Sequence, residues 1–146
     1  VAPFVRDYPV GLFVDTVGPV VANDAYATPE VWREFDKELY HSPRVVWGRE
    51  VNLFLLGTAE QVSAALNASG RPTSASLEAY VRALRGALHR VLAAVDASHV
   101  QHSEVWSYRI TNGRLLPTRY GTSSDVQLWS TTDLAVQYAL SRLPPH

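Results

Sequence analysis

The most regular hydrophobic pattern in this sequence lies between positions 75 and 97. Apolar residues recur there every three or four positions, which is the spacing that places side chains on one face of an α-helix. The members of this stripe are Leu77, Tyr80, Val81, Leu84, Leu88, Val91, Leu92 and Val95. We therefore predict an amphipathic helix over 75–97, whose apolar face must pack against other elements.

Three further helices are predicted around this one. The Thr-Pro-Glu sequence at 28–30 is typical of a helix start, and this helix is expected to run to about Tyr40. A second helix is expected over about 45–67, and because its first half is apolar on nearly every face we expect it to be buried all round. A last helix is expected over about 125–143, with Ser124 as its N-cap.

Residues 104–120 have a different character. Their apolar and polar side chains alternate, and such alternation indicates a half-buried β-strand. The dipeptide Asn112-Gly113 lies between the two alternating segments and is favoured in two-residue hairpin turns, because both residues tolerate positive φ. We predict one β-hairpin near 104–120. Residues 1–27 are interrupted by Pro and Gly, and we expect buried extended or irregular chain there.

Four helices and one hairpin give a fold class that is mainly α. The side chains expected to be mostly buried are Trp47, Leu53, Phe54, Leu56, Leu84, Leu88, Leu128, Trp129, Val136 and Leu140. Two of the predicted helices are apolar on more than one side, and the chain contains no methionine. We therefore expect 1–146 to be a single domain or the C-terminal segment of a larger helical domain, with further polypeptide or a second copy as its partner.

Composition excludes several classes of function. The absence of cysteine excludes disulfides, thiolate catalysis and Cys-bound metals, but it leaves the compartment open between cytoplasmic and secreted. The formal net charge is −1 without a long run of one sign, which argues against a nucleic-acid partner. No apolar run reaches the ~18 residues of a membrane-spanning helix. Because phosphate-loop, dinucleotide and His-metal motifs are absent, we expect no cofactor and no metal.

The sequence YHSPRVVWGRE at 40–50 gathers polar and aromatic residues just before an apolar run. The candidates for a pocket wall are His41, Arg44, Trp47, Arg49 and Glu50. A helix N-terminus presents free N–H groups that bind anions and polyols, and Trp offers a flat apolar face to a ring. The alternative is structural, because the helix dipole favours Glu50 at a first turn and a buried Arg49 needs an acidic partner, either Glu50 or another buried acid.

A second candidate site is the sequence HSEVWSYR at 102–109. Glu104, Trp106 and Tyr108 would face the same side of a strand, because successive side chains alternate. An acid flanked by two aromatic residues is typical of carbohydrate sites, where the carboxylate acts as acid or base. The alternative is an edge hairpin with a solvated Glu and two packed aromatic side chains.

Two further residues complete the candidate binding set. Arg119 precedes a Gly turn and a Ser-Ser-Asp sequence, which is equally well explained as ordinary helix capping. Asp15 is an acid within an apolar stretch, and we expect it to be either the partner of Arg49 or a site carboxylate.

Three segments, YHSPRVVWGREVNLFLLG, SEVWSYRITNGRLLPTRYG and SSDVQLWSTTDLAVQYAL, together resemble the closing part of a six-hairpin (α/α)6-toroid glycosidase. The similarity is to the glucoamylase, trehalase and glycogen-debranching group, and it covers about 100 residues. The resemblance implies helical hairpins from a toroid and an oligosaccharide substrate. It also implies that Glu104 acts as general base on a water in an inverting hydrolysis, with Glu50 as a candidate for the second carboxylate.

Three functions of different classes remain open. The first is a carbohydrate-active enzyme segment. The second is an α-helical ligand-binding or oligomer-forming module without catalysis, in which the same aromatic residues line a cavity or an interface. The third is a structural subunit that completes the core of another chain.

Overall fold

The computed structural model describes residues 1–35, 37, 40–100, 102–120, 123–124, 128 and 131–144. The elements of this part of the chain are, in order, α1 (Ala2–Val5), β1 (Phe13–Val14), β2 (Gly18–Pro19), α2 (Pro29–Phe35), β3 (Val45–Trp47), α3 (Gly48–Ala64), α4 (Ala75–Ser98), β4 (Val105–Thr111), β5 (Arg114–Arg119) and α5 (Thr132–Ser141). About 47% of the described residues are helical and 16% are in strands. The fold is therefore an α+β mix with two small antiparallel sheets, and the prediction of a mainly α class built from toroid-like helical hairpins is wrong.

The predicted helix over 45–67 is a strand followed by a helix. β3 pairs antiparallel with β4, with Val46 opposite Trp106, and α3 begins only at Gly48. A short continuous apolar run does not distinguish a buried strand from a buried helix, and the β-branched pair Val45-Val46 favours the strand. The predicted lone hairpin thereby becomes a three-stranded sheet with the order β3-β4-β5.

The strongest local signals are confirmed. α4 spans Ala75–Ser98, and the Ser74 hydroxyl oxygen accepts a hydrogen bond from the Leu77 N–H at 3.2 Å as its N-cap. The hairpin of β4 and β5 turns at Asn112 and Gly113, whose φ angles of 51° and 72° are the positive values that a two-residue turn of this type requires.

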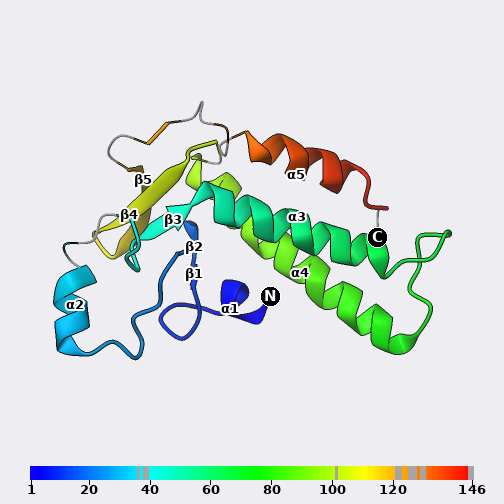
Figure 1. The fold of residues 1–146 in the computed structure, drawn as a ribbon, viewed down its shortest axis with the longest axis horizontal. Coiled ribbons are helices and arrows are strands. Elements are labelled where there is room, and N and C mark those ends of the chain that lie inside the picture. The colour runs from blue at the N-terminus through cyan, green and yellow to red at the C-terminus, as the bar shows by residue number, and fades with distance from the viewer. Residues whose placement is uncertain are drawn as a thin grey trace.

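The elements form a helical layer with a sheet at one end (Figure 1). α3 and α4 run antiparallel beside each other, and α5 packs on α3. The sheet β3-β4-β5 lies beyond one end of these helices, and α2 lies at the outer edge of that sheet, apart from the helical layer. The N-terminal segment packs its β2 strand and α1 against α4.

The centre of the core is the place where the sheet meets the helices. Trp106 is 0% exposed there, and its indole Nε1 donates a hydrogen bond to the Val17 carbonyl at 2.9 Å. Gly48 joins β3 directly to α3, and its N–H donates to the Glu104 carbonyl at 2.8 Å. A Cβ at Gly48 would lie 2.5 Å from the Ser103 carbonyl oxygen, so the close approach of these two backbones requires glycine.

The burial predictions are confirmed for α4 and corrected for α3. Leu84, Leu88 and Val136 are buried, whereas Trp47, Phe54, Leu56 and Leu140 are only partly buried. Leu53 and Leu128 are 51% and 83% exposed, so their predicted burial is wrong, and Trp129 lies outside the described residues. α3 is covered by α4 and α5 on only part of its circumference, which leaves Leu53 on an open face.

Two predicted helices are shorter in the structure. α2 spans Pro29–Phe35 rather than reaching Tyr40, although residues 36, 38 and 39 lie outside the described residues. α5 spans Thr132–Ser141 rather than 125–143, and residues 125–127, 129 and 130 of the predicted helix are not described. A partly buried hydrogen bond attaches α5 to α3, from Asn52 Nδ2 to Thr132 Oγ1 at 2.8 Å.

Candidate functional site

The structure brings the two main candidate clusters of the sequence to one junction. Trp47 pairs with Val105 across β3 and β4, and the Gly48 N–H binds the Glu104 carbonyl. Glu50 follows two residues later in the first turn of α3. The backbones of the two predicted catalytic acids are therefore near neighbours, although they come from segments about fifty residues apart in the chain.

The charged pair at the start of α3 is local. Arg49 donates from Nε and Nη2 to Glu50 Oε1 at 3.0 and 2.8 Å, and both side chains are about half exposed. Asp15 is exposed, and its Oδ1 accepts a hydrogen bond from the Thr16 N–H at 3.0 Å. Arg49 is therefore paired with the adjacent Glu50, which is one of the two partners that the structural alternative allowed, and Asp15 is not its partner.

The three candidates of β4 have different surroundings. Trp106 is fully buried, and a role as an open platform for a sugar ring does not fit that burial. Glu104 is half-buried just before the strand, whereas the half-buried Tyr108 lines a cavity. Arg119 is exposed at the end of β5, opposite Trp106 in the strand register.

His41 and Trp47 are part of a small aromatic cluster next to the junction. Their rings stack with centroids 5.7 Å apart and an interplanar angle of 27°. The Trp47 indole Nε1 donates to the Tyr40 carbonyl at 2.7 Å, and the Tyr40 ring meets the edge of Tyr120 at 5.8 Å. The structure therefore explains His41, Trp47 and Tyr40 by their packing against one another. Tyr120 also lines the cavity described next.

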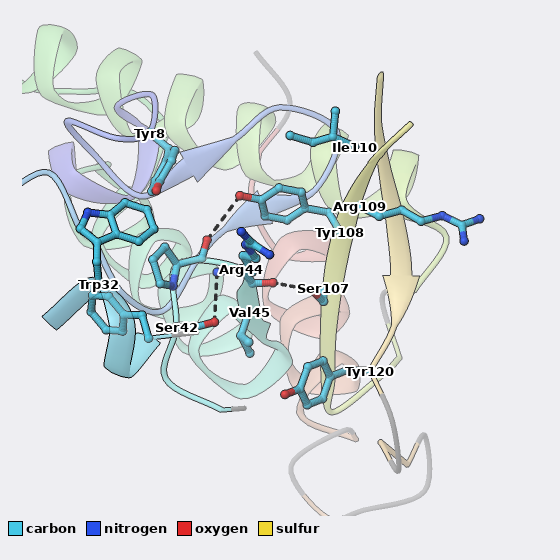
Figure 2. Close-up of a pocket in the computed structure, with 12 residues that line it drawn as sticks. Tyr8, Trp32, Ser42, Arg44, Val45, Ser107, Tyr108, Arg109, Ile110 and Tyr120 are labelled. Carbon is cyan, nitrogen blue, oxygen red and sulfur yellow. Dashed lines mark hydrogen bonds between the residues drawn. The ribbon is translucent and has the colours of Figure 1, made fainter. Parts of the chain in front are cut away.

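A cavity of about 560 Å³ lies between α2, the chain before β1 and the outer part of the sheet (Figure 2). We call it the aromatic pocket. It is lined by Tyr8, Trp32, Phe35, Ser42, Pro43, Arg44, Val45, Ser107, Tyr108, Arg109, Ile110 and Tyr120. α2 supplies Trp32 and Phe35, β4 supplies Tyr108 and Ile110, and the loop before β3 supplies Ser42 to Arg44.

Two phenol groups of the aromatic pocket each donate a hydrogen bond to a different segment of the chain. The Tyr8 hydroxyl donates to Asp24 Oδ2 at 2.5 Å, and Asp24 is only 4% exposed. The Tyr108 hydroxyl lies 3.5 Å from the Pro43 carbonyl oxygen, which it faces as donor (Figure 2). Asp24 is therefore a buried acid that the Tyr8 hydroxyl partly compensates.

Both phenols keep their protons at neutral pH. Burial raises the pKa of Tyr8, and the hydrogen bond to Asp24 and the charge of that carboxylate raise it further. Burial also raises the pKa of Tyr108, against the opposing effect of the Arg44 guanidinium. The aromatic pocket therefore presents neutral hydroxyl groups, which donate hydrogen bonds to a ligand or to buried acceptors.

Arg44 is the cation placed among these rings. Its backbone is fixed on both sides, since its N–H donates to Ser42 Oγ at 3.3 Å and its carbonyl accepts from Ser107 Oγ at 2.7 Å. Among the described residues, none makes an ion pair with the Arg44 guanidinium. Arg109 also lines the cavity, but its side chain extends away from Tyr8 and Trp32 in Figure 2. Arg44 is therefore the charge available to a ligand.

Sequence reasoning had named Arg44 and Tyr108 of this cavity as site candidates, and it missed Tyr8, Trp32 and the neighbouring Asp24. Tyr8 and Asp24 meet across an irregular segment, and no periodic pattern relates them. The usable signal was Asp24 itself, an acid in a largely apolar N-terminal stretch that also contains Asp15. The sequence analysis instead selected Asp15, which is exposed in the structure, whereas Asp24 is buried.

The aromatic pocket offers recognition rather than acid–base chemistry. Glu50 and Glu104 line neither the aromatic pocket nor three further cavities of the described part of the chain, and their predicted catalytic roles stay predictions. The described residues contain no group of three or more His, Cys, Asp or Glu placed to hold a metal ion. Nor does this part of the chain contain a helix with the length and apolar character needed to cross a bilayer.

Comparison of the chain with protein-family models, with curated proteins and with solved structures gave no match. The function is therefore argued from the geometry of the aromatic pocket.

Proposed function

We propose that this chain is a small-molecule binding module, and that the aromatic pocket takes a ligand with a planar ring and an anionic substituent. The observation that carries this proposal is the Arg44 guanidinium, which has no ion-pair partner among the described residues and is surrounded by aromatic side chains. An aromatic carboxylate is the simplest ligand with both features. This proposal corresponds to the ligand-binding hypothesis of the sequence analysis, with an α+β fold in place of the α-helical fold expected there.

Size and lining support a small-molecule ligand. A cavity of about 560 Å³ lies inside the ~300–1,000 Å³ range of small-molecule sites, which are mostly apolar with a few converging polar groups. Two elements supply the aromatic lining, since Trp32 and Phe35 come from α2 and Tyr108 comes from β4. Aromatic faces bury a planar ring at low cost in conformational entropy.

The polar groups favour an anion over a neutral polyol. A guanidinium binds a carboxylate through two parallel hydrogen bonds, which are about twice as strong as bonds between neutral groups. The nearest acid, Asp24, already accepts the Tyr8 hydroxyl, so the local charge open to a ligand comes from Arg44. Glycoside hydrolysis by Glu104 stays a prediction from the sequence resemblance, and a sugar is therefore included in the test.

The test is a calorimetric titration with benzoate, benzyl alcohol and maltose. We expect benzoate to bind at least tenfold more tightly than benzyl alcohol, because a hydrogen bond to a charged group contributes about 1.5–3 kcal/mol. Arg44→Gln should remove this preference. The matched control is Arg114→Gln, an exposed arginine on the hairpin that does not line the aromatic pocket, and it should leave benzoate affinity unchanged.

The opposite pattern would reject the proposal. If maltose binds more tightly than benzoate and Arg44→Gln has no effect, the anion preference is wrong and a carbohydrate ligand is favoured. If benzoate binds equally well to wild type and Arg44→Gln, the aromatic pocket is not its site.

A further inference from the structure

A second cavity, of about 600 Å³, lies along α4 and shares no lining residue with the aromatic pocket. We call it the α4 groove. Its lining comes from one face of α4 and from the loop that precedes this helix, and consists of Leu66, Gly70, Arg71, Pro72, Glu78, Val81, Arg82, Arg85, Gly86 and His89. Positions 78, 82, 85 and 89 are three or four apart, so their side chains lie along one side of the helix.

The α4 groove is positively charged in a chain whose formal net charge is −1. Three arginines and one glutamate line it, which leaves a formal charge of +2 with His89 neutral. Glu78 pairs with Arg82 at 3.2 Å, but both side chains are exposed, and an exposed pair of this kind contributes little. The groove therefore has an excess of cationic groups.

Two of the three arginines, Arg85 and Arg71, differ in whether their side chains have a partner within the chain. The Arg85 Nη2 donates to the Pro144 carbonyl at 2.8 Å, which fixes this side chain while it holds the C-terminal segment. The Arg71 side chain has no hydrogen-bond or ion-pair partner among the described residues, although its backbone N–H binds Asn67 Oδ1 at 3.1 Å. Arg71 thus has a fixed backbone and a guanidinium available for an external anion.

The floor of the α4 groove is apolar and is kept open by a glycine. Leu66, Pro72 and Val81 supply the apolar surface. Gly86 lies in the interior of α4, where glycine costs about 0.8–1 kcal/mol relative to alanine. A Cβ at Gly86 would meet nothing within 4 Å, so packing does not require glycine there. Its structural consequence is an uncovered strip of helix at the floor of the groove.

We propose that the α4 groove binds a small anionic amphiphile, in which a carboxylate or phosphate head is attached to a short alkyl chain. The head is recognised by Arg71 with Arg82, whose positive charges exceed the local negative charge. The alkyl chain lies on Leu66, Pro72 and Val81 over Gly86, where it removes apolar surface from water. The cavity volume is that of a small-molecule site. This site is independent of the proposed function of the aromatic pocket.

The test is a titration followed by amide chemical shifts in two-dimensional NMR. The probes are octanoate, octyl phosphate, 1-octanol and inorganic phosphate, each below its aggregation limit. We expect octanoate and octyl phosphate to shift the amides of Gly70, Arg71 and Gly86, and to bind at least tenfold more tightly than 1-octanol and inorganic phosphate. Equal binding of 1-octanol would overturn the role of the arginines, and equal binding of inorganic phosphate would overturn the role of the apolar floor.

Two glycine variants locate the site. Gly86→Leu fills the groove from its floor, and we expect at least a tenfold loss of octanoate affinity with the helix retained. Gly57→Leu is the matched control, because Gly57 is a helical glycine of α3 whose Cβ would also meet nothing within 4 Å, and it lies outside the groove. The octanoate affinity of Gly57→Leu should stay within twofold of wild type. Equal losses in both variants would overturn the assignment.

Two arginine variants separate the two sites. We expect Arg71→Gln to weaken octanoate binding at least tenfold, while Arg44→Gln in the aromatic pocket leaves it within twofold. If Arg44→Gln abolishes octanoate binding and Arg71→Gln does not, the amphiphile occupies the aromatic pocket and the proposal for the α4 groove is wrong. Circular dichroism melting of each variant confirms that the chain compared is folded.

Discussion

Two tryptophans, one in the sheet and one in α2, show how differently this chain uses the same residue. Trp106, in β4, is 0% exposed, and its indole N–H is bonded to the Val17 carbonyl. Trp32, in α2, is 41% exposed and lines the aromatic pocket. One ring fills the space where β3, β4 and α3 meet, whereas the other forms the side of a cavity that is open to a ligand.

The difference shows that close packing and recognition are separated in this fold. At the junction of β3 and α3 the backbones approach so closely that Gly48 has no room for a Cβ. At the aromatic pocket, by contrast, about 560 Å³ is unfilled between α2 and the sheet. Substitutions at the junction should therefore change the free energy of unfolding, and substitutions at the pocket should change ligand binding.

The largest effect expected is that of Trp106→Ala. Removing a fully buried tryptophan leaves a cavity in the core and should lower the free energy of unfolding by about 3–5 kcal/mol. The matched variant Trp32→Ala removes a partly exposed ring at the pocket and should cost less than about 1 kcal/mol. Urea denaturation measures both values. Similar losses in the two variants would break the distinction between core and pocket.

A smaller effect is expected for Gly48→Ala. The new Cβ would lie 2.5 Å from the Ser103 carbonyl oxygen, so the β3–β4 pairing or the start of α3 must shift. Overpacking of this kind costs about 1–3 kcal/mol. The control is Gly57→Ala within α3, where the added methyl meets nothing and should stabilise the helix by up to about 1 kcal/mol. Stabilisation by both alanine substitutions would show that the junction is not tightly packed.

The sequence was sufficient where local chemistry decides the structure. The stripe of α4 with its Ser74 cap, and the Asn112-Gly113 turn, specify their elements within a few residues of chain. β3 could not be separated from α3, because Val45 to Trp47 continue into an apolar helix and their strand partner lies about sixty residues later. The three-stranded sheet depends on that long-range pairing, and the mainly α prediction failed for this reason.

The candidate site was predictable only in part, for the same reason. Tyr108 was found because an alternating strand places it beside other polar and aromatic residues. Trp32 was not selected as a site residue, although it lies in the predicted helix that starts at 28–30, and it is 41% exposed in the structure. The meeting of Tyr8 with Asp24 arises from irregular chain, whose course has no periodic signature in sequence.

The hydrogen bond between Tyr8 and Asp24 tests how much the aromatic pocket contributes to stability. Tyr8→Phe removes the hydroxyl that donates to Asp24 and leaves a 4% exposed carboxylate without that partner. Loss of one partner of a buried polar pair costs about 1–3 kcal/mol, and we expect the low end because the Tyr8 side chain is only partly buried. The control is Tyr26→Phe, since Tyr26 is 93% exposed, and its urea midpoint at pH 7 should equal that of wild type.

The smallest effect expected is the pH dependence of the same contact. Burial and Asp24 raise the pKa of Tyr8 above the ordinary tyrosine value of 10.0, so the folded chain holds this proton more tightly than the unfolded chain does. The stabilisation is complete below pH 10 and is lost as pH rises beyond it. One such proton gives at most about 1.4 kcal/mol per pH unit, and solvent screening of the partly exposed phenol makes the slope smaller.

Between pH 10 and 11 the urea midpoint of wild type should therefore fall more steeply than that of Tyr8→Phe, whereas Tyr26→Phe should keep the wild-type slope. Parallel curves for wild type and Tyr8→Phe would mean that the Tyr8 proton is not held by Asp24, and that the aromatic pocket presents a hydroxyl free to bind a ligand.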